Sequence, residues 1–162
     1  MAVGIIAEFN PFHNGHKYLL KTAKEKTTER VVVIISGAFV QRGGIAITDK
    51  HTRARAALLN GADLVIELPV IYSHNTAQKF AMGAVATLIG CGIIDSLAFG
   101  SESADISAIS TAAKILADEP QEVSDKIKTL MSEGVPFPVA RQTAYSGYFN
   151  TDILRAPNDI LA

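Results

Sequence analysis

Two histidines, His13 and His16, stand three residues apart with Gly15 between them. They follow an apolar run, residues 3–7, that is typical of a short buried strand, and they precede a helical pattern over residues 16–23. A helix N-terminus presents unpaired backbone N–H groups and a partial positive charge, which attract anions. Two imidazoles there add donors for the same anion, and Gly15 lets backbone approach a ligand closely. The segment therefore predicts an anion site on the turn between a strand and a helix.

The wider string that contains these histidines, residues 7–16, reads Ala-Glu-Phe-Asn-Pro-Phe-His-Asn-Gly-His. Its last four residues resemble the HxGH signature of the nucleotidyltransferase superfamily, and the whole string resembles the bacterial tRNA(Met) cytidine acetate ligase family. In that superfamily the paired histidines bind nucleotide phosphates and stabilise the transition state, so the resemblance implies that His13 and His16 are catalytic. The nucleotide-binding residues that it implies are Ile6, Ala7, Glu8, Phe9, Asn10, Pro11, Phe12, His13, Asn14, Gly15, His16, Gly100 and Asn158.

Other stretches are similar to the same family, and ordinary nucleotidyltransferases do not generally carry the first three together. These stretches are residues 36–43, the dipeptide Asp49-Lys50, residues 60–69, residues 99–102 and residues 156–162. The resemblance implies ATP-dependent activation of acetate to acetyl-adenylate. It also implies acetyl transfer to the wobble cytidine of elongator tRNA(Met), which forms N4-acetylcytidine. ATP, acetate and tRNA(Met) are the expected ligands, and an adenylate-forming ligase is the expected enzyme class.

The length and composition fit one domain of a globular protein. The chain has 162 residues, a formal net charge of -1 and one cysteine, Cys91. One cysteine excludes an internal disulfide and argues against a thiolate metal cluster. The chain lacks the strong net positive charge that is typical of nucleic-acid-binding proteins. A tRNA partner would therefore need a local basic patch. We see no signal peptide and no apolar run long enough to span a membrane, so we expect a cytoplasmic protein without a membrane partner.

Strand and helix patterns alternate along the first two thirds of the chain. After residues 3–7, stretches rich in apolar residues at 31–35, 62–69 and 93–99 predict strands, and residues 50–59 and 75–89 predict helices between them. This alternation predicts an α/β, Rossmann-like parallel sheet of nucleotidyltransferase type, with additional C-terminal helices from about residue 105. We expect residues 1–162 to form one ATP-binding domain, truncated at its C-terminus. A Walker A sequence is absent, which excludes a P-loop mechanism.

Basic and aromatic residues outside the histidine turn are weaker candidates. Arg42, beside two glycines, and Lys50 are candidate phosphate or tRNA contacts. Lys50 also belongs to a basic cluster with Arg53 and Arg55 near a helix start, where cations oppose the helix dipole. That placement is compatible with a functional site and equally with a solvated face.

The aromatic candidates lie near the C-terminus. Arg141 with Tyr145 and Tyr148 could contact RNA by charge and stacking, or could serve ordinary packing.

The chemistry leaves the cofactor and the reaction class partly open. Adenylation by ATP usually needs Mg²⁺, but the sequence shows no set of residues that would bind this ion. Zinc at the two histidines is not supported either, because no Cys or further His completes a ligand set. Two alternatives remain beside the ligase. One is another HxGH adenylyl- or cytidylyltransferase acting on a small substrate. The other is a non-catalytic module that binds nucleotide or RNA.

Overall fold

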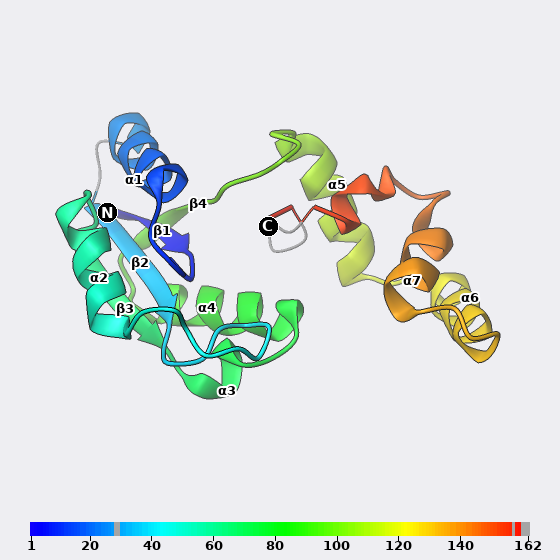
Figure 1. Cartoon of the computed structure of the whole chain (residues 1–162). Coiled ribbons are helices and arrows are strands. Elements are labelled where there is room, and N and C mark those ends of the chain that lie inside the picture. Colours follow the sequence, from blue (N-terminus) through cyan, green and yellow to red (C-terminus); the bar gives the residue numbers. More distant parts are fainter. Residues whose placement is uncertain (28–29, 157, 160–162) are drawn as a thin grey trace. The chain divides into compact units, whose positions relative to one another are not determined.

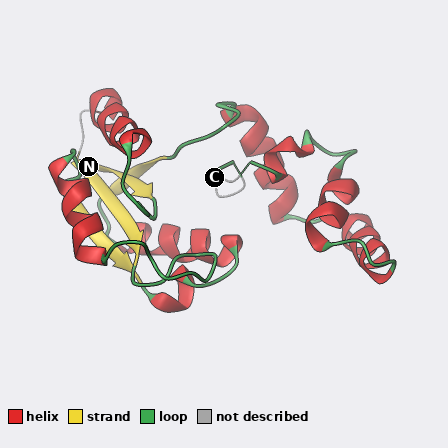
Figure 2. Ribbon diagram, in the orientation of Figure 1, coloured by secondary structure: helices red, strands yellow, loops and turns green. Residues whose placement is uncertain are grey.

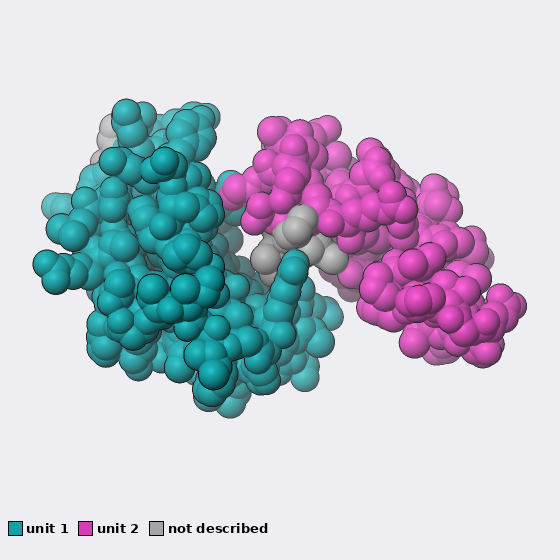
Figure 3. All heavy atoms as spheres, viewed as in Figure 1, with its two compact units in different colours: residues 1–99 teal, residues 100–162 magenta. Residues whose placement is uncertain are grey.

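The structure, a computed structural model, describes residues 1–27, 30–156 and 158–159. The chain divides into two compact units, residues 1–99 and residues 100–162 (Figure 3). The first unit contains the whole sheet, and in its described part the second unit is helical (Figure 2). Whether residues 1–162 act as one ATP-binding domain stays a prediction.

The sheet consists of four parallel strands in the order β3-β2-β1-β4 (Figure 1). The strands are β1 (Ala2–Ile6), β2 (Arg30–Ser36), β3 (Leu64–Leu68) and β4 (Ile94–Ala98). Each lies within two residues of its expected bounds. The parallel α/β fold expected from the sequence is therefore confirmed.

Helices pack on both faces of the sheet because β2 is apolar at every position from 31 to 35. Alternate residues of a strand point to opposite faces. Val31, Val33 and Ile35 join the core beneath α1 (Asn14–Thr27) and α2 (Lys50–Leu59). Val32 and Ile34 join the core beneath α4 (Ala77–Gly90), which follows the short α3 (Val70–Ser73). The first unit is thus a three-layer sandwich.

The strand order has a topological switch point between β1 and β4. From β1 the chain proceeds to β2 and β3 on one side, and returns to β4 on the other side of β1. Ligands of open α/β sheets bind outside the carboxyl ends of the strands at such a switch. The turn after β1 carries the two histidines, and it starts at this point.

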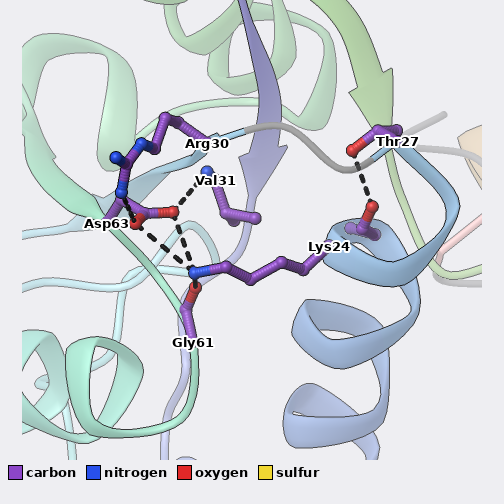
Figure 4. Close-up of polar contacts among 7 residues, drawn as sticks. Lys24, Thr27, Arg30, Val31, Gly61 and Asp63 are labelled. Carbon is purple, nitrogen blue, oxygen red and sulfur yellow. Dashed lines mark hydrogen bonds and ion pairs between the residues drawn. The ribbon is translucent and has the colours of Figure 1, made fainter.

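At the amino end of the sheet, opposite the histidine turn, polar contacts surround Asp63 (Figure 4). The Asp63 carboxylate accepts hydrogen bonds from the Val31 backbone N–H at 2.9 Å, from Lys24 at 3.2 Å and from Arg30 at 3.0 Å. These contacts join the last turn of α1 to the amino ends of β2 and β3. We call this group the Asp63 clamp.

The second unit has α5 (Ile106–Ala117), α6 (Gln121–Ser132), α7 (Phe137–Tyr145) and a 3-10 helix, η1 (Thr151–Leu154). The three α-helices correspond to the helices expected from about residue 105. Their core consists of Val123, Ile127, Ala140, Ala144 and Tyr145. Within the described ranges, no helix is both long enough and apolar enough to cross a membrane.

Candidate active site

The two histidine rings stack on each other at the start of α1. Their centroids lie 3.6 Å apart and their planes differ by 21°. The His13 backbone N–H donates to Nδ1 of His16 at 3.3 Å, and the Gly15 backbone N–H donates to Nδ1 of His13 at 3.1 Å. A neutral imidazole whose Nδ1 accepts a hydrogen bond carries its proton on Nε2. Both rings therefore present an Nε2–H donor.

Burial and the neighbouring ring keep His16 neutral. Loss of water around the half-buried imidazole, and then the charge of nearby His13, lower the pKa of His16 to about 4. At neutral pH His16 is therefore a hydrogen-bond donor without a positive charge. His13 is exposed and so can meet a ligand from solution.

Gly15 leaves room for the His13 ring in this turn. A Cβ on Gly15 would lie 3.0 Å from Cε1 and 3.1 Å from Nδ1 of the His13 ring. These distances are tighter than nine in ten real Cβ contacts. The missing side chain thus makes room for the His13 ring to fold back over the first turn of α1.

Two phenylalanines, Phe9 and Phe12, pack against the His16 ring. Phe9 is fully buried, and its centroid lies 4.8 Å from that of His16 and 5.0 Å from that of Phe12. Aromatic rings at these separations attract one another in tilted or edge-to-face arrangements. Phe9 has a φ of 50°, a left-handed conformation that is rare for a bulky residue. The turn is thus held in a strained conformation that places Phe9 beneath the histidine.

Side chains of the turn also fix the loop that follows β2. The Glu8 carboxylate accepts from the Gln41 backbone N–H at 2.6 Å, and Oδ1 of Asn10 accepts from the Ile47 N–H at 2.7 Å. The loop between these two contacts contains exposed Arg42. Of the implied nucleotide-binding residues of the turn, Glu8 and Asn10 thus have a structural role that the sequence did not show.

Lys50, the other basic candidate, is paired. Its Nζ lies 2.6 Å from Oε2 of Glu67, and both side chains are nearly half exposed. Exposed ion pairs contribute little free energy, so a ligand anion can compete for Lys50. Both Arg42 and Lys50 stay candidate phosphate or tRNA contacts.

Gly100 and Asn158 both lie in the second unit, and Asn158 is hydrogen-bonded to the loop that follows Gly100. Asn158 donates to the Glu102 carboxylate through its backbone N–H at 3.2 Å and its side-chain Nδ2 at 2.7 Å. Asp159 in turn accepts from the backbone N–H groups of Glu102 and Ser103, each at 3.1 Å. These contacts bring Asn158 to the loop that begins at Gly100. Residues 157 and 160–162 of the family-like stretch at 156–162 lie outside the described residues.

Arg53 has a structural role that the sequence did not show, since the sequence placed it only in a basic cluster with Lys50 and Arg55. Arg53 is 1% exposed, so the solvated face, one of the two interpretations of its basic cluster, is wrong for this residue. The detectable signal was its spacing. Arg53 lies four residues before buried Ala57, on the core-facing side of α2.

The C-terminal aromatic candidates differ in exposure. Tyr145 is fully buried and donates to the Glu119 carboxylate at 2.6 Å, whereas Tyr148 is 41% exposed. Packing, one of the two alternatives considered, therefore accounts for Tyr145.

A dedicated metal site is not formed by the residues that the structure describes. They contain no group of three or more His, Cys, Asp or Glu side chains able to hold a metal ion. The donor set fits an anion rather than a cation, because the histidine turn presents N–H groups. The described side chains therefore do not fit a protein-bound Mg²⁺.

This chain is similar in sequence and in fold to known proteins. Residues 1–162 match the model of a family described as HIGH Nucleotidyl Transferase. A tRNA(Met) cytidine acetate ligase of Clostridium novyi is 48% identical over 98% of this chain and 41% of its own length. One from a Thermoanaerobacter strain is 45% identical over 99% and 41%.

A solved structure extends the likeness to the fold. The structure of Thermotoga maritima TmcAL bound with alpha-thio ATP has a TM-score of 0.88 at 38% identity, over 99% of this chain and 41% of that one. The chain thus spans about two fifths of the length of the relatives it matches.

Proposed function

The chain belongs to the HIGH nucleotidyl transferase family, and from this premise we propose that it supplies the ATP site of a tRNA(Met) cytidine acetate ligase. The sequence likeness to ligases of that name supports the substrate class. The likeness to a TmcAL structure with an ATP analogue supports the nucleotide. Acetate and tRNA(Met) are the proposed substrates, and the cytoplasm, where tRNA is used, is the proposed location.

In the first proposed step, a carboxylate oxygen of acetate attacks the α-phosphorus of ATP. The bond from that phosphorus to the bridging oxygen breaks, which gives acetyl-adenylate and pyrophosphate. Negative charge accumulates on the phosphoryl oxygens in the transition state, and fixed donors stabilise it most. The Nε2–H groups of His13 and His16 are such donors, because their Nδ1 atoms are already engaged by backbone.

In the second proposed step, the exocyclic amine of cytidine attacks the acetyl carbonyl. The amide bond forms, AMP leaves with the electron pair of the broken C–O bond, and the amine loses one proton. Exposed Arg42 and Tyr148 are candidates for contacts to RNA.

The stacked imidazole pair at the start of α1 is the observation that carries this proposal. We expect His16→Ala to lower acetate-dependent exchange of pyrophosphate into ATP by roughly 10²–10³, the range for one lost transition-state donor. Tyr18→Phe, at a position 71% exposed on the same helix, is the matched control and should keep the wild-type rate. An unchanged rate in His16→Ala would contradict the proposal, and so would exchange that needs a phosphorylated substrate in place of acetate.

Arg42 can be assigned to phosphate or to tRNA with two assays. Pyrophosphate exchange requires no tRNA, whereas acetylation of tRNA requires both steps. If Arg42 contacts tRNA, we expect Arg42→Ala to leave exchange unchanged and to lower acetylation about tenfold, as expected for a lost charged contact. Loss of both activities would assign it to ATP, and no loss in either assay would remove it from the site.

A further inference from the structure

Arg53 is a buried cation that connects the loops at the carboxyl end of the sheet. Its Nη1 donates to the Glu8 carbonyl oxygen at 2.8 Å and to Oγ of Ser36 at 3.3 Å, and its Nε donates to the Thr48 carbonyl at 3.1 Å. Its Nη2 donates to the Gly37 carbonyl. One side chain on α2 thus holds the turn after β1, the end of β2 and the segment before α2.

This placement is costly unless every donor is used. Burial lowers the pKa of Arg53, and the nearby carboxylates of Glu8, Asp49 and Glu67 partly offset that effect. Among the described residues no carboxylate forms an ion pair with it. Backbone carbonyls therefore provide most of the compensation for the buried charge.

The hydrogen bond from Arg53 to the Glu8 carbonyl affects the position of the histidines through the strained residue Phe9. Fixing the Glu8 carbonyl fixes the plane of the Glu8–Phe9 peptide, and rotation of that plane sets φ of Phe9. Phe9 holds its φ of 50° and packs its ring 4.8 Å from His16. Strained backbone persists only where its surroundings over-determine it.

We propose that Arg53 is a positioning residue that holds the His13–His16 pair in its reactive arrangement by fixing the Glu8–Phe9 peptide. The inference rests on the function proposed above, because it assigns Arg53 to the adenylation site. Arg53 acts through the backbone and touches neither ATP nor acetate. A displacement of about 1 Å at such a site can cost 10²-fold in rate.

The test compares Arg53→Met and Arg53→Lys with Asp63→Asn in the intact protein. Asp63 lies in the clamp at the amino end of the sheet, so Asp63→Asn serves as a control for lost stability away from the site. Two quantities are measured well below the unfolding temperature of each variant. They are the rate of acetate-dependent pyrophosphate exchange and the NMR signals of the His13 and His16 rings.

We expect Arg53→Met to lower the exchange rate between about 10- and 100-fold and to shift both ring signals. Arg53→Lys should show a partial loss, because one ammonium group cannot reach all the carbonyls that the planar guanidinium reaches. Asp63→Asn should change neither quantity. Wild-type rates and ring signals in Arg53→Lys, or in a folded Arg53→Met, would overturn the proposal.

The two readouts separate this proposal from the proposed function. If the wild-type protein shows no acetate-dependent exchange, the ligase function fails, but the ring signals still decide the role of Arg53. If Arg53→Met does not fold, Arg53→Lys gives the answer. Equal shifts of the ring signals in Asp63→Asn and the Arg53 variants would also count against a specific positioning role.

Discussion

At the scale of single residues, the site depends on two stacked imidazoles, of which His16 stays neutral at neutral pH. Two protonated rings at a separation of 3.6 Å would repel, and His16 has also lost part of its hydration. Neutral rings still donate through Nε2 because backbone N–H groups hold their Nδ1 atoms. The pair therefore offers directed Nε2–H donors for a polyphosphate, and His16 donates without a positive charge at neutral pH.

The low pKa of His16 gives a test that needs no substrate. Burial is the larger cause and the charge of His13 the smaller. We therefore expect His13→Ala to raise the pKa of His16 from about 4 without returning it to the ordinary value of 6.5. An NMR pH titration of the ring signals measures this. An unchanged pKa would exclude coupling between the rings, and a complete return to 6.5 would show that burial is not the main cause.

At the scale of elements, the Asp63 clamp secures α1 to the sheet at the end opposite the histidines. Burial raises the pKa of Asp63, but hydrogen bonds from Val31, Arg30 and Lys24 outweigh it, so the net shift is downward. A carboxyl whose pKa is lowered by folding stabilises the fold above its unfolded pKa, and this stabilisation is lost as pH falls through the folded pKa.

We expect Asp63→Asn to lower the free energy of unfolding by about 1–2 kcal/mol at pH 7, because hydrogen bonds to a charged group contribute roughly 1.5–3 kcal/mol and solvent partly screens the 20% exposed Asp63 side chain. The difference from wild type should shrink below pH ~4, where the wild-type carboxyl also becomes protonated. Urea unfolding at several pH values measures this. Glu25→Gln, in the exposed Lys21–Glu25 pair of the same helix, is the control and should change stability by less than about 0.5 kcal/mol. A pH-independent difference for Asp63→Asn would contradict the electrostatic account.

The elements that the sequence predicted are those with a clear apolar run or a helical period. Residues 31–35 are all β-branched and form β2, and the helix pattern at 50–59 matches α2. The four-residue α3 and η1 are too short to show a period, so they were not predicted. At the site, the histidine turn was predictable from local spacing. The role of Arg53 was not, because its partners Glu8 and Gly37 are far from it in sequence.

At the scale of the whole molecule, the chain consists of two compact units with separate cores. The sheet unit is packed around β2, and the helical unit is packed around Tyr145. The chain covers about two fifths of the relatives that it matches. Complete acetyl transfer is therefore a property proposed for the whole enzyme, and ATP binding is the part that we propose for this chain.

Separate cores predict separate responses to mutation. Tyr145→Ala removes a buried ring and its hydrogen bond to Glu119. We expect a loss of about 3–5 kcal/mol in the stability of the second unit, as for large-to-small changes in a core. Hydrogen exchange read by mass spectrometry should show faster exchange in peptides of residues 100–162 and unchanged exchange in β1 and β2. Equal acceleration in the sheet strands would show that the two units unfold together.

The central claim is that the paired rings of His13 and His16 bind the phosphates of ATP. Its most direct test is an ATP titration of protein with isotope-labelled histidine, followed through the ring nitrogen signals of all four histidines. We expect saturable shifts at Nε2 of His13 and His16 that are clearly larger than those of exposed His51 on α2, which lies beside the candidate contact Lys50. Saturating ATP that leaves both rings unshifted, or that shifts His51 equally, would contradict the central claim.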